Sequence, residues 1–138
     1  MKIISIDPDV RKSGYSEYRN GTLTCCTSMY IWTLFEELKI PCDLVIIEDS
    51  RLNRCSSWHA GGRGAVKNVG KNQAVCVILE DFCKFHGIKY QLVKPNGYSN
   101  MFADEKNFQA TTGYKQKTNM DARASAAIGW GMRNLTKI

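Results

Sequence analysis

The sequence predicts an α/β protein with a mixed five-stranded sheet, three strands antiparallel and two more parallel, and helices on both faces. Residues 1–27 contain three strand-like runs, two of which flank Asn20-Gly21, the strongest short hairpin signal. From residue 29 onward, helical and strand-like segments alternate, which is typical of parallel strands joined by helices. No linker or internal repeat interrupts the 138 residues, so we expect one domain spanning residues 1–138.

Five segments have the character of strands. Residues 1–6 are mostly apolar, and residues 14–19 and 22–27 form the hairpin around Asn20-Gly21. Residues 43–48 (DLVIIE) are a short apolar run bounded by charge, the pattern of a strand buried on both faces. Residues 88–93 (IKYQLV) give the fifth strand.

The remaining segments are predicted as helices joined by loops. Residues 29–39 place four apolar side chains on one helical face: Ile31, Leu34, Phe35 and Leu38. A loop rich in Gly, Ser and Arg is expected over 51–64, followed by the longest helix over 65–86. A weaker helix is expected over roughly 98–110, and an alanine-rich helix over about 120–133 closes the chain.

Composition excludes several classes of protein. No apolar run approaches the ~18 residues of a membrane span, so no membrane association is expected. The six cysteines show no paired CxxC spacing, which argues against a zinc site and favours free thiols in a reducing cytosol. A cytoplasmic protein is therefore expected.

The positive charge is concentrated in two places. The net charge is +6, and residues 51–72 contain five basic side chains, one tryptophan and no acid. This pattern predicts a nucleic-acid contact surface, although a solvated loop is the simpler alternative. The predicted DNA contacts are Arg51, Arg54, Trp58, Arg63, Lys67 and Lys71, with Lys115 and Lys117 from a second basic set that also contains Arg123.

Three carboxylates are candidates for a shared site. Asp7 ends the first strand and Glu48 ends the fourth, and in the predicted topology these strands are parallel neighbours whose carboxyl ends meet. Asp121 begins the last helix. Each has a simpler explanation: Asp7 as a turn residue, Glu48 as a polar strand end, and Asp121 as an acid favoured by the helix dipole. Together they suit Mg²⁺, with Mn²⁺ as a substitute, and phosphodiester chemistry beside a basic surface.

Three motifs resemble those of the RuvC-like Holliday-junction resolvases, within the ribonuclease H-like superfamily. They are IDPDVRKSGYS at 6–16, VIIE at 45–48 and DARASAAIG at 121–129. The resemblance implies a homodimer that binds four-way DNA junctions and nicks opposing strands with Mg²⁺ in DNA recombination and repair. It also implies that Asp7, Glu48 and Asp121 are metal ligands. At 138 residues the chain is compact for the family, which fits a phage-type or other mobile-element version in the cytoplasm of a bacterial or phage-infected cell.

One departure from the family pattern concerns the fourth ligand. The family usually has a further acid or His three residues from the third ligand, but Thr118 and Ala124 occupy those positions. Asn119 is the predicted replacement, and Asp49 is the next candidate. The departure leaves two alternatives open: a catalytically weak nucleic-acid-binding protein of the same fold, and a ribonuclease H-like hydrolase of RNA–DNA hybrid.

The helix over 65–86 is also the predicted dimer contact. Its apolar side chains cover well over a third of its circumference: Val75, Val77, Ile78, Leu79, Phe82 and Phe85. A helix that is apolar most of the way round is buried on more than one side. We therefore expect a symmetric homodimer built on this helix, with a core helix under a long loop as the alternative.

Overall fold

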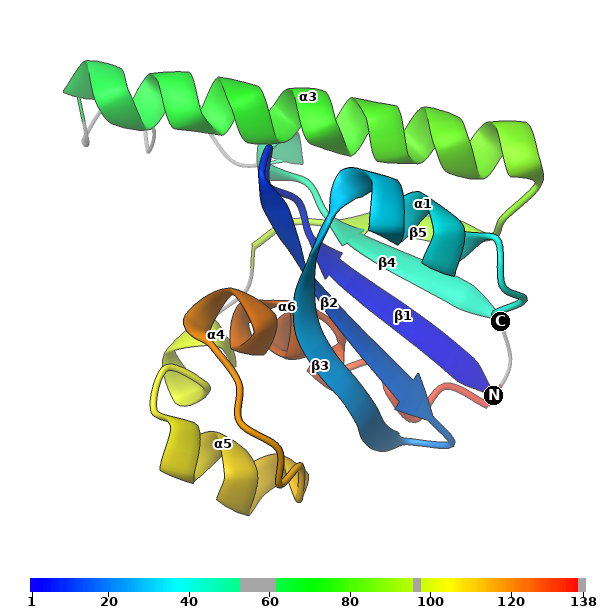
Figure 1. Ribbon diagram of the computed structural model, residues 1–138, viewed down its shortest axis with the longest axis vertical. Helices are drawn as coiled ribbons and strands as arrows, with labels where there is room; N and C mark the ends of the chain where they lie inside the picture. Colours follow the sequence, from blue (N-terminus) through cyan, green and yellow to red (C-terminus); the bar gives the residue numbers. More distant parts are fainter. Residues whose placement is uncertain (53–61, 96–97, 137–138) are drawn as a thin grey trace.

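The computed structural model describes residues 1–52, 62–95 and 98–136, without the side chains of residues 62–69, 98 and 99. Its sheet has the strand order β3-β2-β1-β4-β5 (Figure 1). The strands are β1 (Lys2–Asp7), β2 (Lys12–Arg19), β3 (Thr22–Tyr30), β4 (Leu44–Glu48) and β5 (Tyr90–Val93). The first three are antiparallel, whereas β4 and β5 run parallel to β1, so the predicted mixed five-stranded sheet is confirmed.

The β2–β3 hairpin turns at Asn20-Gly21 as predicted. Asn20 has φ 51° and Gly21 has φ 84°, the left-handed pair that a two-residue hairpin turn requires. Both strands are longer than the sequence suggested, because β2 begins at Lys12 and β3 continues to Tyr30. The hairpin therefore reaches the end of the sheet where β1 and β4 terminate.

Two helices cover one face of the sheet. They are α1 (Ile31–Leu38) and α3 (Gly62–His86), which crosses above the sheet in Figure 1. Leu34 and Leu38 of α1 are buried against Ile4, Ile6 and other strand residues, as the helical spacing predicted. The loop predicted over 51–64 is wrong at both ends, because a 3₁₀ turn, η1, occupies Ser50–Leu52 and α3 already begins at Gly62. The part of the prediction over 53–61 lies outside the described residues.

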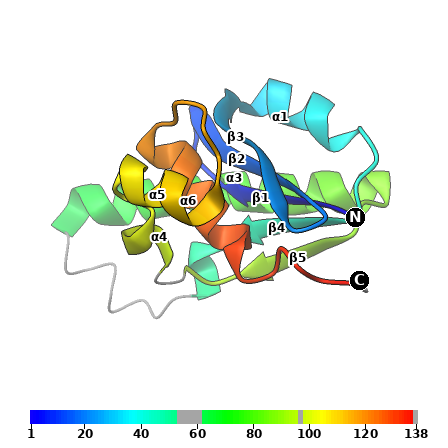
Figure 2. The same cartoon turned by 90° about the horizontal axis from the view of Figure 1, so that it is seen from below.

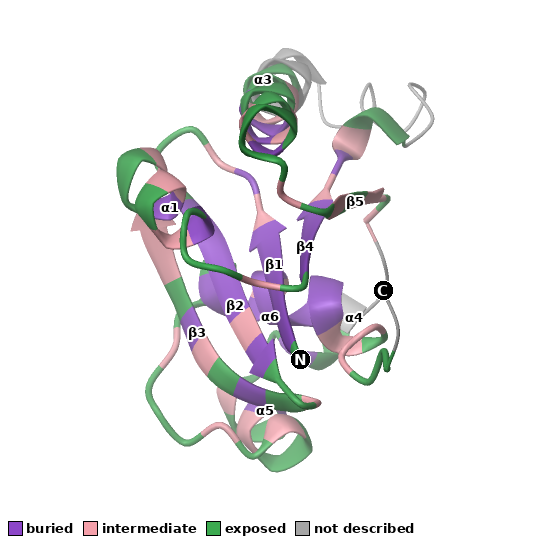
Figure 3. Cartoon of the chain, turned by 90° about the vertical axis from the view of Figure 1, so that its right-hand side faces the viewer, coloured by how far each residue is buried: buried purple, intermediate pink, exposed green. Residues whose placement is uncertain are grey.

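Three further helices lie on the opposite face (Figure 2). They are α4 (Tyr98–Met101), α5 (Glu105–Thr112) and α6 (Met120–Trp130). The single helix predicted over 98–110 is wrong: Asp104 accepts a hydrogen bond from the Lys106 amide and caps a new helix, so the segment divides in two. Helix α6 is the element most deeply buried of the three (Figure 3).

Both faces of the central strands are buried, as Figure 3 shows in purple. In β4, Leu44 and Ile46 pack toward α6, whereas Val45 and Ile47 pack toward α1 and α3. This alternation is the strand period of two acting inside a covered sheet. In the part of the chain that the structure describes, no helix is long and apolar enough to cross a membrane.

Candidate active site

The strand period places Asp7 and Glu48 on the same face of the sheet. Ile6 of β1 pairs with Ile47 of β4, and each carboxylate follows its isoleucine by one residue. Since both isoleucines face α1 and α3, the next side chains face the opposite side, which α6 covers. The sequence prediction that these two strand ends are parallel neighbours is confirmed.

Helix α6 is held against the sheet by small side chains and buried hydrogen bonds. Ser5 Oγ donates to the carbonyl of Ser125 at 2.8 Å, and Tyr18 OH donates to that of Ala126 at 2.6 Å. Ser16 Oγ lies 2.7 Å from Ser125 Oγ, which makes a third link. These contacts fix the helix that carries Asp121.

Gly14 permits the close approach of α6 at the site itself. It pairs with Asp7 across the β1–β2 ladder. A Cβ on Gly14 would overlap the carbonyl oxygen of Asp121 and lie 2.9 Å from the Cβ of Ser125. Glycine is therefore required there for the N-terminus of α6 to lie beside the end of β1.

The turn after β1 is stabilised by Asp9 and not by Asp7. Asp9 Oδ1 accepts a hydrogen bond from the Arg11 amide at 2.9 Å, the local bond expected of a turn aspartate. Ser13 Oγ adds a bond to the Asp9 carbonyl at 3.3 Å. Within the described residues, the Asp7 carboxyl has neither a hydrogen bond nor an ion pair. The simpler explanation of Asp7 as a turn residue therefore fails.

Asp7 and Glu48, at the two strand ends, both have a raised pKa. Burial raises the pKa of Asp7 to about 6, and the nearby carboxylates of Asp121 and Asp9 contribute to the rise. Burial raises the pKa of Glu48 to about 7, with Asp7 as the second cause. Both acids are partly buried, Asp7 raises the pKa of Glu48, and neither carboxyl has a cationic partner among the described side chains. Such a pair forms a site suited to a bound cation.

A small recess of about 60 Å³ joins this pair to α3 and η1. Asp7, Pro8 and Glu48 line it together with Ser50 and Asn72. The sequence prediction missed Asn72, because an asparagine on the polar side of a helix carries no signal of its own. Among the side chains that the structure describes, no three of His, Cys, Asp and Glu converge closely enough to hold an ion as they stand. Oxygen donors nevertheless dominate the recess, which fits a hard cation.

Asn119, the predicted fourth ligand, has a structural function. It is the N-cap of α6, and its Oδ1 accepts from the Ala122 amide at 2.8 Å while its Nδ2 donates to Ser28 Oγ at 3.0 Å. It lines a different cavity, of about 290 Å³, that also contains Lys117. Its role as a ligand stays a prediction.

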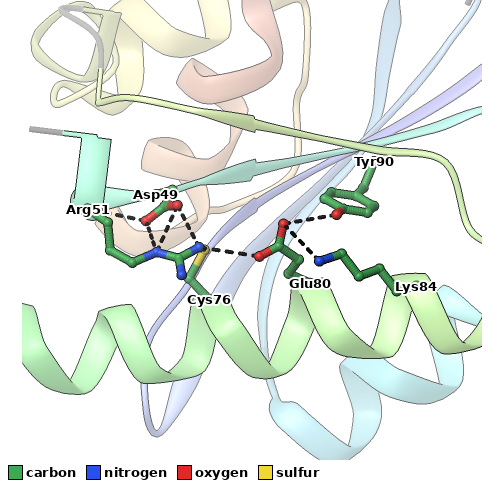
Figure 4. Close-up of polar contacts among 6 residues, drawn as sticks. All are labelled: Asp49, Arg51, Cys76, Glu80, Lys84 and Tyr90. Atoms are coloured by element: carbon green, nitrogen blue, oxygen red, sulfur yellow. Dashed lines mark hydrogen bonds and ion pairs between the residues drawn. The ribbon is translucent and has the colours of Figure 1, made fainter.

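Asp49 and Arg51 form an ion pair beside the part of α3 that carries Cys76 and Glu80 (Figure 4). Asp49 is 1% exposed, and its carboxylate lies 2.8 Å from the Arg51 guanidinium. Burial alone would raise the pKa of Asp49, but hydrogen bonds from Arg51 lower it. Glu80, which also accepts a hydrogen bond from Tyr90 OH, lies 3.5 Å from the same guanidinium. Arg51 therefore balances the negative charge of Asp49 without a bound metal ion. Asp49 and Glu80 in turn balance the positive charge of Arg51 without bound DNA.

The other predicted DNA contacts fall into three groups. Lys71, Lys115 and Lys117 are exposed. Arg63 and Lys67 lie on α3, but their side chains are not described, and Arg54 and Trp58 lie outside the described residues. Arg123, from the second basic set, is buried, and it donates to the carbonyls of Phe102 and Ala103. It stabilises the fold around α6 and is not a surface charge.

Comparison with solved structures finds resolvases over nearly the whole chain. The Holliday junction resolvase of fowlpox virus matches with a TM-score of 0.60 and 17% identity, over 96% of this chain and 98% of its own. Thermus thermophilus RuvC in complex with a Holliday junction substrate matches with a TM-score of 0.56 and 12% identity, over 96% and 95%. A further structure of T. thermophilus RuvC gives a TM-score of 0.53 and 12% identity, over 93% and 92%.

The likeness is one of fold. No family model matches the sequence, and no curated protein matches it. The matched regions cover more than nine-tenths of this chain and of each resolvase chain. The chain therefore has a RuvC-like fold, as its three motifs suggested.

Proposed function

We propose that this protein is a metal-dependent endonuclease that nicks four-way or other branched DNA junctions in recombination and repair. The observation that carries the proposal is the half-buried pair of Asp7 and Glu48, without a cationic partner among the described residues, at adjacent parallel strand ends. The structural neighbours support the substrate class, because they are Holliday junction resolvases and one was solved with its junction.

Asp7, Glu48 and Asp121 are the proposed catalytic carboxylates and Mg²⁺ ligands, with Mn²⁺ as a substitute. Cations of this kind, when bound, activate a water and stabilise the leaving oxygen of an in-line displacement. The protein holds Asp7 and Glu48 on buried strands and Asp121 on a helix anchored by Ser125 and Ala126. Near neutral pH the raised pKa values keep part of the Asp7 and Glu48 carboxyl population protonated until a cation displaces those protons.

Asn72 is the proposed fourth oxygen donor. Its side chain lines the same recess as Asp7 and Glu48, whereas Asn119 lines another cavity and caps α6. Asp49 is a weaker candidate because it already pairs with Arg51. A neutral amide in place of the usual acid leaves the metal site with less negative charge, so we expect weaker binding of the second ion.

The proposed assembly is a homodimer through α3. Val75 and Leu79 of α3 are buried against the sheet, but Ile78 and Phe85 on the same helix are 48% and 85% exposed. Large apolar side chains gathered on an exposed helix face mark an interaction surface. Two copies would provide two sites for the two strands of a junction.

The decisive experiment compares substrates of one sequence in four forms: four-way junction, linear duplex, single strand and RNA–DNA hybrid. We expect Mg²⁺-dependent nicks in the junction and little cleavage of the duplex. Asp7→Asn and Glu48→Gln should abolish cleavage but retain binding of the junction. Preference for the hybrid would instead identify a ribonuclease H-like enzyme, and binding without cleavage in Mg²⁺ or Mn²⁺ would identify a binding protein.

A further inference from the structure

A second cavity adjoins the carboxylates on the side of the β2–β3 hairpin. Its volume is about 370 Å³, and Asp9, Arg11, Lys12, Tyr30 and Asp121 line it. Asp121 connects it to the strand-end pair, since the Asp121 charge raises the pKa of Asp7. The cavity therefore combines one proposed catalytic acid, Asp121, with the basic residues Arg11 and Lys12 and with Asp9.

An exposed aromatic pair lies at this cavity. The rings of Tyr30 and Trp32 are stacked, with centroids 4.7 Å apart and planes inclined by 8°. Tyr30 is 42% exposed and Trp32 is 63% exposed, so neither is needed for the core, which Leu34 and Leu38 of the same helix fill. The pair is a preformed flat surface of the kind on which a nucleic-acid base stacks.

The charges beside the aromatic pair are available to phosphates. Lys12 Nζ lies 4.9 Å from the centroid of the Tyr30 ring. The Arg11 and Lys12 side chains form no ion pair with any described residue. The nearby Asp9 carboxylate accepts a hydrogen bond from the Arg11 backbone amide and not from its guanidinium. This differs from Arg51, whose charge is compensated by Asp49 and Glu80. Cations that have no ion-pair partner and lie beside an aromatic surface match a polyanion with flat bases.

We propose that Tyr30, Trp32, Arg11 and Lys12 hold the DNA strand next to the cleaved phosphate. A base unstacked near the branch point lies against Trp32, and adjacent phosphates contact Arg11 and Lys12. This surface positions the strand from the side of the β2–β3 hairpin. The inference rests on the proposed function and adds a binding surface that the basic sequence pattern did not indicate.

The test measures junction affinity with Asp7→Asn as the parent, so that cleavage does not interfere. Trp32→Ala should weaken binding about 5- to 150-fold, the effect of losing one stacked base, and Trp32→Phe should restore most of it. Lys12→Ala should lower the slope of log affinity against log salt by about 0.7–0.9, one phosphate contact. The matched controls are Ile40→Ala, 49% exposed beyond the other end of α1, and Lys89→Ala, before β5 at the far end of the sheet.

Two results would overturn the inference while leaving the proposed function intact. One is that the wild type cleaves the junction while Trp32→Ala and Lys12→Ala bind the junction as tightly as their control variants do. The other is a change in sedimenting mass for Trp32→Ala with unchanged DNA affinity, which would make the surface a protein contact. If the wild type neither binds nor cuts any DNA, the proposed function fails and this inference fails with it.

Discussion

At the scale of single residues, the question is why a buried strand ends in an aspartate followed by proline. The local turn needs an aspartate two positions later, because Asp9 makes the bond to the Arg11 amide. Asp7 instead points toward α6, where burial and two neighbouring carboxylates raise its pKa to about 6. A destabilised charge that local structure does not use is typical of a functional residue.

The raised pKa values predict how stability depends on pH. Between about pH 4 and 7, the folded protein retains protons on Asp7 and Glu48 that the unfolded chain has lost. The free energy of unfolding of the metal-free protein should therefore fall as pH rises through this range. Asp7→Asn should raise it by about 1–3 kcal/mol at pH 8 and by little at pH 4.

Thermal unfolding with and without Mg²⁺ measures this effect. Magnesium should stabilise the wild type more at pH 8 than at pH 5, because protons compete for the same oxygens. It should stabilise Asp7→Asn far less. If Asp7→Asn were less stable than the wild type at pH 8, the negative charge of Asp7 would be compensated in the folded protein.

Gly14 gives a prediction that links packing to catalysis. In Gly14→Ala the new methyl group overlaps the Asp121 carbonyl and displaces the start of α6. We expect a loss of about 1–3 kcal/mol of stability, and a fall in cleavage rate of about 100-fold for a displacement near 1 Å.

Gly70→Ala is the matched control, since a Cβ there meets nothing within 4 Å. It lies inside α3 and should be stabilising by about 0.5–1 kcal/mol without effect on cleavage. Chemical denaturation and single-turnover kinetics measure both quantities. Normal cleavage by Gly14→Ala would mean that Asp121 tolerates movement and does not act with Asp7.

At the scale of elements, sequence patterns predicted what depends on local periodicity. The hairpin, the five strands and the helices α1, α3 and α6 follow from turn residues and apolar spacing. The division into α4 and α5 was missed because the Asp104 cap sits inside a segment with weak periodicity. The start of α3 was missed because the glycines near 62–64 suggested a loop. The later turns of α3 pack against the sheet, and a helix stabilised in this way tolerates glycines in its first turn.

The candidate site was predictable to the same extent. Asp7 and Glu48 end adjacent parallel strands, so topology alone predicted that they are neighbours. Asp121, near the start of α6, lies close enough to Asp7 to raise its pKa, whereas a shared site of all three stays a prediction. The partners of Asp49, Arg51 and Asn119 depend on tertiary contacts that no local pattern encodes. Asn72 faces the recess through the position of α3, which sequence spacing does not specify.

Two substitutions of Asn119 distinguish its role as the N-cap of α6 from a role as a metal ligand. Asn119→Ala should cost about 0.5–2 kcal/mol of stability, because the Ala122 amide loses its acceptor. Asn119→Ser keeps a capping oxygen and should retain both stability and Mg²⁺ affinity within about twofold. Calorimetric titration of the metal and denaturation of each variant provide the measurement. Lost metal affinity at unchanged stability in Asn119→Ser would establish Asn119 as a ligand.

At the scale of the whole molecule, the two faces of the sheet carry different functional features. The face covered by α6 holds the carboxylates, whereas α3 on the other face presents apolar side chains to solvent. Ile78 and Phe85 are seven residues apart and therefore lie on the same side of α3. Charged α3 neighbours such as Lys84 could form the polar rim of such a contact.

This arrangement predicts a dimer whose loss uncouples the two nicks. Wild-type protein should sediment as a dimer at micromolar concentration, whereas Ile78→Glu with Phe85→Glu should sediment as a monomer, because the substitutions would place four carboxylates in one contact. Met101→Glu, at a 48% exposed position on the opposite face, is the control and should remain dimeric. The monomeric variant should still bind DNA, since the carboxylates lie on the face covered by α6. On a four-way junction in a supercoiled plasmid, it should give mainly single nicks, whereas the dimer gives paired nicks and a linear product. A monomeric wild type that yields paired nicks at the same concentration would exclude α3 as the assembly contact.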